Sequence, residues 1–245
     1  MSSMTDATRD IQSIVVLTGA GISAESGLAT FRGPDGLWEG QRVEDICTPE
    51  ALERDRRLVL EFYDQRRRAL DSVDPNEAHR ALARLDSRWP GDLLIVTQNV
   101  DDLHERAGAR RVLHMHGELR SALCESCGER AAFGGNMLDG PRCGACGQDR
   151  LRPDIVFFGE MPYEMEQIDR ALMNADLFVS IGTSGAVYPA AGFVETARHV
   201  GAETLELNLE PSAGSIYFHE TRLGPASMLV PAWVDEVLAE QAAES

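Results

Sequence analysis

Short apolar runs alternate along the chain with segments of helical periodicity. Three runs have the nearly continuous apolar character of strands buried on both faces: Ser13–Thr18, Leu93–Thr97 and Leu177–Ile181. Three shorter runs are further strand candidates: Val112–Met115, Thr204–Leu209 and Met228–Val230. Such strands are typical of parallel sheets whose two faces are covered by helices. The alternation therefore predicts an α/β fold built on a doubly wound parallel sheet.

Capping residues mark where several helices begin. Thr48 precedes Pro49, and Pro is favoured at the first helical position. Asp74 precedes Pro75, with Glu77 at the third helical position as a variant of the capping box. Further helical patterns cover Tyr163–Asn174, Pro189–Val200 and Ala232–Ala242.

Two segments interrupt this alternation. Gly27–Cys47 lacks periodicity and is too long for an ordinary connection, which predicts a lid over a site. Arg120–Arg152 is rich in Cys and Gly and poor in apolar residues, so something other than a hydrophobic core must hold it together.

Composition narrows the classes of function. The chain has 245 residues, of which 40 are acidic and 23 basic, and its formal net charge is −17. Every basic residue is an arginine, so no Lys is present to form a Schiff base or to complete a phosphate-binding P-loop. The acidic excess argues against a nucleic-acid partner, because nucleic-acid binding depends on a basic face.

The compartment is indicated by the N-terminal residues and the cysteines. Met1–Ser13 is polar and has no apolar core of a signal peptide, and no apolar run approaches the ~20 residues that span a bilayer. Four of the five Cys form two C-x-x-C pairs, which suit a reducing compartment better than a disulfide framework does. We expect a cytoplasmic protein with no membrane partner.

A glycine motif follows the first predicted strand directly. Gly19–Ala24 fits G-x-G-x-x-A, in which small residues let a phosphate approach backbone N–H groups. A simple tight strand–helix turn is the alternative. The second strand with a terminal acid that dehydrogenases carry is missing, and the segment Phe31–Trp38 stands in its place. A nucleotide bound here would be held differently.

The cysteine pairs have the spacing of a metal site. Cys124 and Cys127 are separated from Cys143 and Cys146 by fifteen residues. Four thiolates at this spacing predict a closed tetrahedral zinc site, which stabilises a segment too polar to fold by burial. Redox use of a pair is the alternative. The fifth cysteine, Cys47, reads as a small, partly buried residue.

Polar residues follow the ends of four predicted strands, where such folds bind ligands. Thr97–His104 follows one strand and His114–Glu118 the next, and His116 is the candidate general base because its pKa lies near neutrality. A His–Asp metal site or a purely structural His is the alternative. Gly182–Ser184 and Asn208–Glu210 suit phosphate and ribose contacts, or plain turn and cap chemistry.

Together these stretches resemble the sirtuin family of NAD-dependent protein-lysine deacylases over nearly the whole chain. The motifs that carry the resemblance are Gly19–Ser23, Glu25–Gly27, Phe31-Arg32, Gln98–Asp101, His116-Gly117, the two Cys pairs, Phe158–Glu160, Gly182–Ser184 and Asn208–Glu210. The resemblance implies three parts: a Rossmann-like NAD-binding domain (residues 11–38, 82–119 and 155–245), a helical insertion with the acyl pocket (39–81) and a zinc-binding module (120–154). It also explains the missing strand, because sirtuins cover NAD with a flexible loop.

The resemblance also implies roles for individual residues. NAD contacts fall on Gly19, Ala20, Gly21, Ile22, Ser23, Glu25, Phe31, Arg32, Trp38, Gln98, Asn99, Val100, Asp101, Gly182, Thr183, Ser184, Asn208, Leu209, Glu210 and Ala226. His116 is the implied general base, while Asn99 and Asp101 orient ribose and water. The acyl oxygen attacks the nicotinamide ribose, and the products are free lysine, nicotinamide and O-acyl-ADP-ribose. The implied partners are proteins with acylated lysines, which add as an extended strand along Val156, Phe157 and Gly159, and we expect a monomer.

A finer resemblance concerns the acyl group. Tyr63 and Arg66 resemble the Tyr-x-x-Arg pair of class III sirtuins, which read the carboxylate of succinyl, malonyl or glutaryl groups. At positions i and i+3 of a helix the two side chains share a face, and a guanidinium fork matches a carboxylate. A solvated face at Arg66–Arg68 is the alternative on spacing alone. The activity expected is desuccinylation with deacetylation; a mainly deacetylating enzyme, protein ADP-ribosyl transfer and a zinc-ribbon adaptor are the other hypotheses.

Overall fold

Six parallel strands form the central sheet of the computed structural model, which describes residues 11–30, 37–38 and 41–244, with only the backbone of residues 37, 38 and 244. The spatial order β11-β10-β9-β1-β4-β5 puts β1 near the middle, with Val16 opposite Ile95 on one side and Val179 on the other. The strands are β1 (Ser13–Thr18), β4 (Asp92–Thr97), β5 (Val112–His114), β9 (Leu177–Ile181), β10 (Glu203–Asn208) and β11 (Glu220–Leu223). The predicted doubly wound parallel sheet is confirmed.

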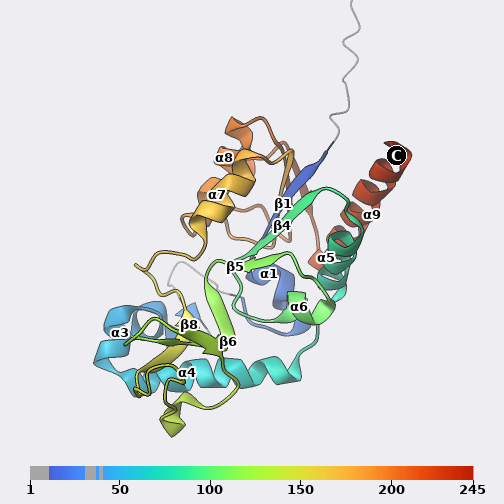
Figure 1. Ribbon diagram of the computed structural model, residues 1–245. Coiled ribbons are helices and arrows are strands. Elements are labelled where there is room, and N and C mark those ends of the chain that lie inside the picture. The colour runs from blue at the N-terminus through green and yellow to red at the C-terminus, as the bar shows by residue number, and fades with distance from the viewer. Residues whose placement is uncertain (1–10, 31–36, 39–40, 245) are drawn as a thin grey trace, which may run out of the picture.

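Helices cover both faces of this sheet (Figure 1). Alternate residues of β1 point to opposite faces: Ile14 and Val16 enter a core with α5 and α9, and Val15 and Leu17 enter a core with α7 and α8. These helices are α5 (Glu77–Arg88), α7 (Met165–Met173), α8 (Phe193–His199) and α9 (Ala226–Glu244), and the short α1 (Ala20–Ser23) and α6 (Leu103–Ala107) follow β1 and β4. Burial on both faces explains why the strands are apolar without interruption.

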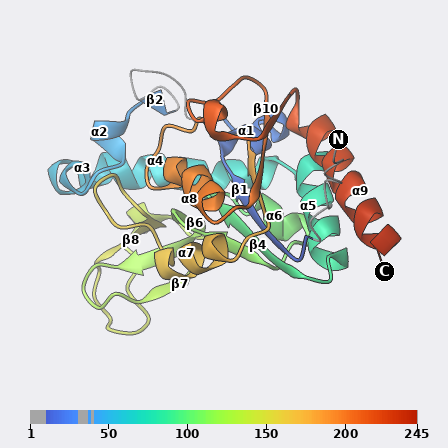
Figure 2. The ribbon, with the colours of Figure 1, turned by 90° about the horizontal axis from the view of Figure 1, so that it is seen from above.

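A second group of elements lies at the end of the molecule opposite α9 (Figures 1 and 2). It contains α2 (Val43–Ile46), α3 (Pro49–Arg54), α4 (Arg56–Ala69) and an antiparallel sheet of β7 (Arg130–Ala132), β6 (Gly117–Cys124) and β8 (Leu151–Ile155). Buried residues of α2, α4, β6 and β8 share a third core. A two-residue ladder, β2 (Leu37–Trp38) with β3 (Gln41–Arg42), and the 3-10 turns η1 (Ala24–Ser26), η2 (Leu70–Ser72), η3 (Met137–Asp139), η4 (Ala190–Gly192) and η5 (Ser215–Tyr217) complete the described elements.

The helix starts agree with the sequence in one case and differ in another. Thr48 caps α3 as predicted, because its hydroxyl accepts the N–H of Ala51 at 3.0 Å. The cap of α5 is Asn76 and not Asp74, because the Asn76 amide oxygen accepts the Ala78 N–H at 2.9 Å. Glu77 therefore stands at the first helical position, and His79 completes the capping box.

The strand predicted at Met228–Val230 is wrong. These residues lie inside α9, where Val230 is fully buried against the sheet while Met228 is 68% exposed. A three-residue apolar run is compatible with a strand or with one turn of a buried helix. Here packing against the sheet stabilises the helix. The edge strand is β11, whose residues are mostly exposed and gave no apolar signal.

Part of the predicted lid, Gly27–Cys47, lies outside the described residues, and the described part contains β2, β3 and α2. The three domain ranges given from the sequence stay a prediction. Among the described helices, none has the length and apolarity needed to cross a membrane.

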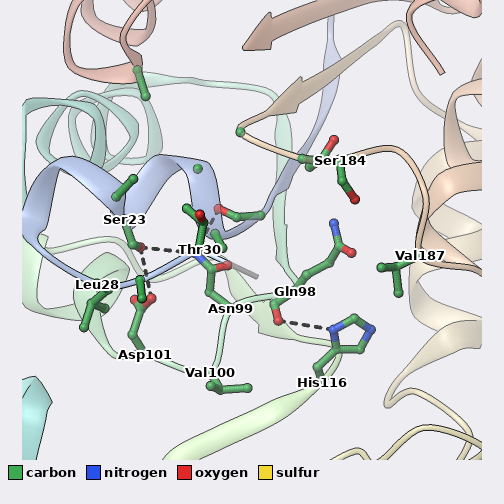
Figure 3. Close-up of a pocket in the computed structure, with 18 of the residues that line it drawn as sticks. Ser23, Leu28, Thr30, Gln98, Asn99, Val100, Asp101, His116, Ser184 and Val187 are labelled. Atoms are coloured by element: carbon green, nitrogen blue, oxygen red, sulfur yellow. Dashed lines mark hydrogen bonds between the residues drawn. The ribbon is translucent and has the colours of Figure 1, made fainter. Parts of the chain in front are cut away.

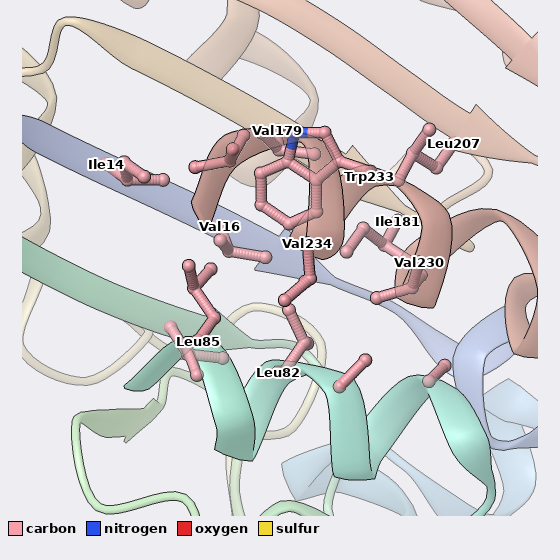
Figure 4. Close-up of a cluster of buried hydrophobic side chains, with 14 of the residues drawn as sticks. Ile14, Val16, Leu82, Leu85, Val179, Ile181, Leu207, Val230, Trp233 and Val234 are labelled. Carbon is pink, nitrogen blue, oxygen red and sulfur yellow. The ribbon is translucent and has the colours of Figure 1, made fainter. Parts of the chain in front are cut away.

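Leu82 tests the core between α5 and α9. Its side chain is fully buried there and lies near Val234 and Leu85 (Figure 4). We expect Leu82→Ala to lower the free energy of unfolding by about 2–5 kcal/mol, through lost burial and the cavity left behind. Urea denaturation measures this. Leu58→Ala, on the 36% exposed Leu58 of α4, is the control and should cost far less; equal losses would contradict the packing.

Candidate active site

A cavity of about 1160 Å³ opens where all six strands of the central sheet end. It collects most of the residues expected to bind NAD, which reach it from the loops after β1, β4, β9, β10 and β11: Gly19, Ala20, Gly21, Ser23, Glu25, Gln98, Asn99, Val100, Asp101, Gly182, Thr183, Ser184, Asn208, Leu209, Glu210 and Ala226. His116 reaches it after β5, and Arg66, Val156, Phe157 and Gly159 line its other end. Figure 3 shows Ser23, Asn99, Asp101, Gln98, His116 and Ser184 around this cavity.

Five expected residues do not line the cavity or cannot be placed. Ile22 is fully buried in the core of the sheet, so only its backbone belongs to the glycine turn. Phe31 and Arg32 lie outside the described residues, as does the side chain of Trp38. Tyr63 is fully buried behind the wall.

The glycine turn is held against the end of β9 by direct backbone contact. A Cβ on Gly21 would lie 2.6 Å from Gly182 Cα, and a Cβ on Gly19 would lie 2.8 Å from Gly182 O. Gly182 has φ +63°, a conformation that disfavours other residues. The Gly21 N–H donates to Gly182 O at 2.9 Å. The motif therefore needs glycine for close contact with the loop after β9 as well as for any phosphate.

A buried polar network fixes the loop after β4 to this turn (Figure 3). The Asn99 side-chain amide donates to Gly19 O at 3.1 Å and to the Ser23 hydroxyl at 3.2 Å. The Ser23 hydroxyl in turn donates to Asp101 Oδ2 at 3.0 Å. Burial raises the pKa of the Asp101 carboxyl, although the Leu103 N–H and the Ser23 hydroxyl oppose this shift.

His79 on α5 faces the Ser23 hydroxyl and adds to this network. Its Nδ1 accepts the Asn76 N–H at 3.3 Å, so in the neutral ring Nε2 carries the proton and faces the Ser23 hydroxyl at 3.4 Å. Burial lowers the pKa of His79 to about 4, so the ring stays neutral. Sequence reasoning missed this residue; a His beside Ala78 on the apolar face of α5 was the available signal.

Residues 114–119 hold the loop after β4 by donating hydrogen bonds to the carbonyl groups of that loop. Four consecutive carbonyl oxygens each accept a bond: Thr97 O from Met115 N–H at 3.0 Å, Gln98 O from His116 Nδ1 at 3.2 Å, Asn99 O from His114 Nδ1 at 3.1 Å and Val100 O from Leu119 N–H at 2.8 Å. The loop is thus fixed on its backbone side by residues 114–119.

His116 has the arrangement of a general base. Because the Gln98 carbonyl can only accept, Nδ1 of His116 carries the ring proton and Nε2 is left with its lone pair. Burial lowers the pKa of His116, and the bond to Gln98 opposes this shift only in part. The imidazole is therefore neutral at neutral pH and ready to take a proton.

The end of the cavity where the acyl group is expected is formed by α4 and the segment before it. Arg66 lines the cavity, and its guanidinium carbon lies 5.3 Å from the centre of the Phe62 ring. The Tyr63 ring stacks on Phe157 at 5.9 Å, and its buried hydroxyl interacts with Cys47. Cys47 itself lines the cavity, so Tyr63 stands one layer behind it.

The four paired cysteines fit one zinc ion. Their sulfur atoms lie within 4.8 Å of one another, with 3.6 Å between Cys124 and Cys146 and 3.7 Å between Cys127 and Cys143. A tetrahedral zinc with bonds of about 2.3 Å requires sulfur atoms about 3.8 Å apart. Among the described residues no other group of metal-binding side chains gathers in this way, which disfavours the His–Asp metal alternative.

Sequence reasoning also missed the apolar part of the cavity wall. These residues come from loops, helix ends and strand β6, without a motif of their own: Leu28, Ala69, Leu70, Leu119, Pro162, Val187, Tyr188, Pro189, Pro211 and Pro225. Only the three-dimensional path of the chain brings them together.

The zinc site is tested by comparing cysteines. We expect one zinc per chain in the purified protein, lost in Cys146→Ser because a closed site needs all four thiolates. Elemental analysis measures the metal. Cys47→Ser is the matched control and should keep its zinc, because Cys47 stands outside the cluster. Full zinc in Cys146→Ser would refute the assignment.

Comparison with known proteins identifies the family. The model of the Sir2 family matches residues 19–189, more than half of the chain. An NAD-dependent protein deacylase of Vibrio cholerae is 54% identical over 232 residues, which is 94% of each chain. A Sir2 homologue solved in complex with NAD is 36% identical, with a TM-score of 0.86 over 95% of this chain and 91% of the other. Sir2Af2 bound to a myristoylated histone peptide is 30% identical, with a TM-score of 0.73 over 96% of this chain and 94% of the other. The family expected from the motifs is confirmed: the chain belongs to the Sir2 family.

Proposed function

We propose that this protein uses NAD to remove acyl groups from lysine side chains of other proteins, with a preference for acyl groups that end in a carboxylate. The observation that carries the proposal is the cavity itself. One space joins the glycine turn, the free Nε2 of His116 and the guanidinium of Arg66. Relatives that are more than half identical, such as the deacylase of Vibrio cholerae, support the NAD-dependent reaction.

The residues present fit NAD. The glycine turn, the Gly182–Ser184 loop and Asn208 offer small residues, backbone N–H groups and hydroxyls for phosphates and ribose. Gln98, Asn99 and Asp101 would hold the nicotinamide half. When bound, NAD supplies an electrophilic ribose carbon from which nicotinamide departs.

His116 acts as the base in this scheme. Its neutral Nε2 takes a proton from a ribose hydroxyl, which prepares that oxygen to receive the acyl group. The Gln98 carbonyl holds the proton on Nδ1 and so keeps the correct tautomer. The Ser23–Asp101 network holds the loop that faces the base.

The preference for an acidic acyl group rests on Arg66. Arg66 belongs to α4 and brings a positive charge to the end of the cavity that Cys47 and Leu70 also line. A guanidinium in a partly dry pocket binds a carboxylate with two parallel hydrogen bonds. The small Cys47 leaves room for the acyl chain. Tyr63 lies behind Cys47, so its hydroxyl would have to pass the Cys47 side chain to reach a carboxylate. Acetyl-lysine also fits such a pocket, so deacetylation accompanies the main activity.

The partner is a protein with an acylated lysine. An extended peptide would add beside Val156–Gly159 and the loop after Ser184 through backbone bonds. The rim of the cavity exposes Phe158 (46%) and Tyr188 (73%), which suits contact with a peptide. Sir2Af2, a structural relative, binds a myristoylated histone peptide, which supports this kind of partner. A monomer remains the proposed state.

Arg66 tests the acyl preference. We expect Arg66→Met to lower kcat/KM for a succinyl-lysine peptide by about 10- to 100-fold, since a charged hydrogen-bonded contact is worth about 1.5–3 kcal/mol. Activity on the matching acetyl-lysine peptide should change little. Nicotinamide release and peptide mass report both reactions.

Arg68→Met on the same helix is the matched control, because Arg68 is exposed. Equal losses on the two peptides would remove Arg66 from carboxylate recognition and leave a mainly deacetylating enzyme. Labelled ADP-ribose on the target protein would instead favour ADP-ribosyl transfer.

His116 tests the base. We expect His116→Ala to lower turnover by about 10²- to 10⁴-fold, while NAD binding and zinc content stay unchanged. In the wild type, kcat/KM should rise with pH as His116 loses its proton. Because the pKa of His116 is lowered, the rise should already be complete at a pH below about 6.5, the ordinary pKa of histidine. An acid limb that persists in His116→Ala would assign that titration to another group.

A further inference from the structure

His114 lies two residues before the proposed base and is bonded very differently. It ends β5, its side chain is 8% exposed, and it does not line the cavity. Its Nδ1 lies 3.1 Å from Asn99 O, and its Nε2 lies 2.9 Å from Glu105 Oε1 on α6. The mechanism makes no use of this side chain.

Both partners of the ring are acceptors. A carbonyl oxygen and an ionised carboxylate can only accept, so both ring nitrogens must carry a proton when both bonds form. A neutral imidazole has a single proton and must release either Asn99 or Glu105. The geometry is therefore that of an imidazolium, whereas His116 has one acceptor and one free nitrogen.

The charges around the ring favour the same state. Glu105 and Glu118 face it from α6 and β6, the latter at 3.9 Å, Asp101 faces it from the loop after β4, and His104 on α6 is also near. Burial opposes the charge, but the bond to Glu105 and the two nearby glutamates raise the pKa of His114 above its ordinary value.

His114 does not line the cavity, but it holds Asn99, which does. The Asn99 side chain is bound to Gly19 O and Ser23, and the Asn99 carbonyl is bound to His114. Release of the carbonyl would let this peptide unit turn and would carry the Asn99 amide away from the glycine turn.

We propose that His114 is a positioning residue whose imidazolium, paired with Glu105, fixes the Asn99 carbonyl and makes NAD affinity decrease as the pH rises. The inference rests on the proposed function only in that the chain must bind NAD. The sign follows from the charge state: affinity is full while His114 is protonated and falls as the proton is lost. The effect is about three- to tenfold, the size expected for one ordinary hydrogen bond, because the bond to His114 acts on NAD only through Asn99.

Calorimetric titration with NAD, without any peptide, tests this between about pH 6 and pH 9. The wild type should bind NAD more weakly at the alkaline end. His114→Ala should bind NAD weakly throughout and lose the pH dependence. His199→Ala, which changes an exposed His on α8, is the control and should keep the wild-type profile.

The double variant Glu105→Gln/Glu118→Gln separates positioning from simple structural support. The new amide can donate to a neutral Nε2 while Nδ1 still donates to Asn99 O. This variant should therefore keep nearly the wild-type affinity of about pH 6 over the whole range. Imidazole nitrogen shifts in the wild type should show both His114 nitrogens protonated at neutral pH.

The outcomes are distinct. NAD binding that does not change with pH in the wild type, or that changes equally in His114→Ala, overturns the inference alone. A neutral His114 ring at neutral pH overturns it as well. A wild-type protein that binds no NAD at any pH overturns the proposed function and the inference together.

Discussion

Backbone contact between two strand ends is the constraint on which the site depends. Gly21 and Gly182 approach so closely that a single methyl group on either would collide with the other's main chain. This contact brings the turn after β1 against the end of β9, the two neighbouring strands from which the chain continues to opposite sides of the sheet. Open parallel sheets bind ligands at such a point, because the loops diverge there and leave a crevice. The remaining strand ends add their loops around it.

The loop after β4 shows how this crevice becomes a chemical site. Its carbonyl side is bonded by residues 114–119, and its side chains are bonded to the glycine turn through Ser23 and Asn99. Two histidines of one short segment take part with opposite results. His116 bonds to the Gln98 carbonyl through Nδ1 alone, which leaves Nε2 free, and burial keeps the ring neutral. His114 instead has an acceptor at each ring nitrogen, the Asn99 carbonyl and the Glu105 carboxylate. Their roles differ because of what each ring faces and not because of residue type.

The Arg66 end of the cavity depends on how α4 is attached to the cysteine-bearing segment. Arg56 pairs with Glu125 at 2.7 Å, beside the first Cys pair. Further along, the buried Asp64–Arg67 pair accepts the Met137 N–H through Asp64 and donates to Leu119 O through Arg67. A buried ion pair adds little net stability to a protein, but removing one partner costs much stability, because the other charge is left buried and unpaired. Such a pair therefore fixes the geometry around it. These contacts orient the helix that carries Arg66, so the cysteine-bearing segment helps to place Arg66 at the cavity.

Local sequence was sufficient for the parallel sheet, the glycine turn and the cysteine cluster, because each depends on neighbours in the chain. Uninterrupted apolar runs require burial on both faces, and C-x-x-C pairs bring their own ligands together. Sequence could not distinguish a strand from a helix at Met228–Val230 or choose Asn76 over Asp74 as the cap, because packing against the sheet decides both. Nor could it place Tyr63 behind Cys47, or separate the charge states of His114 and His116. Those properties depend on groups distant in sequence, such as Asn99 and Gln98 opposite the two rings, and only the tertiary structure brings these groups within hydrogen-bonding distance.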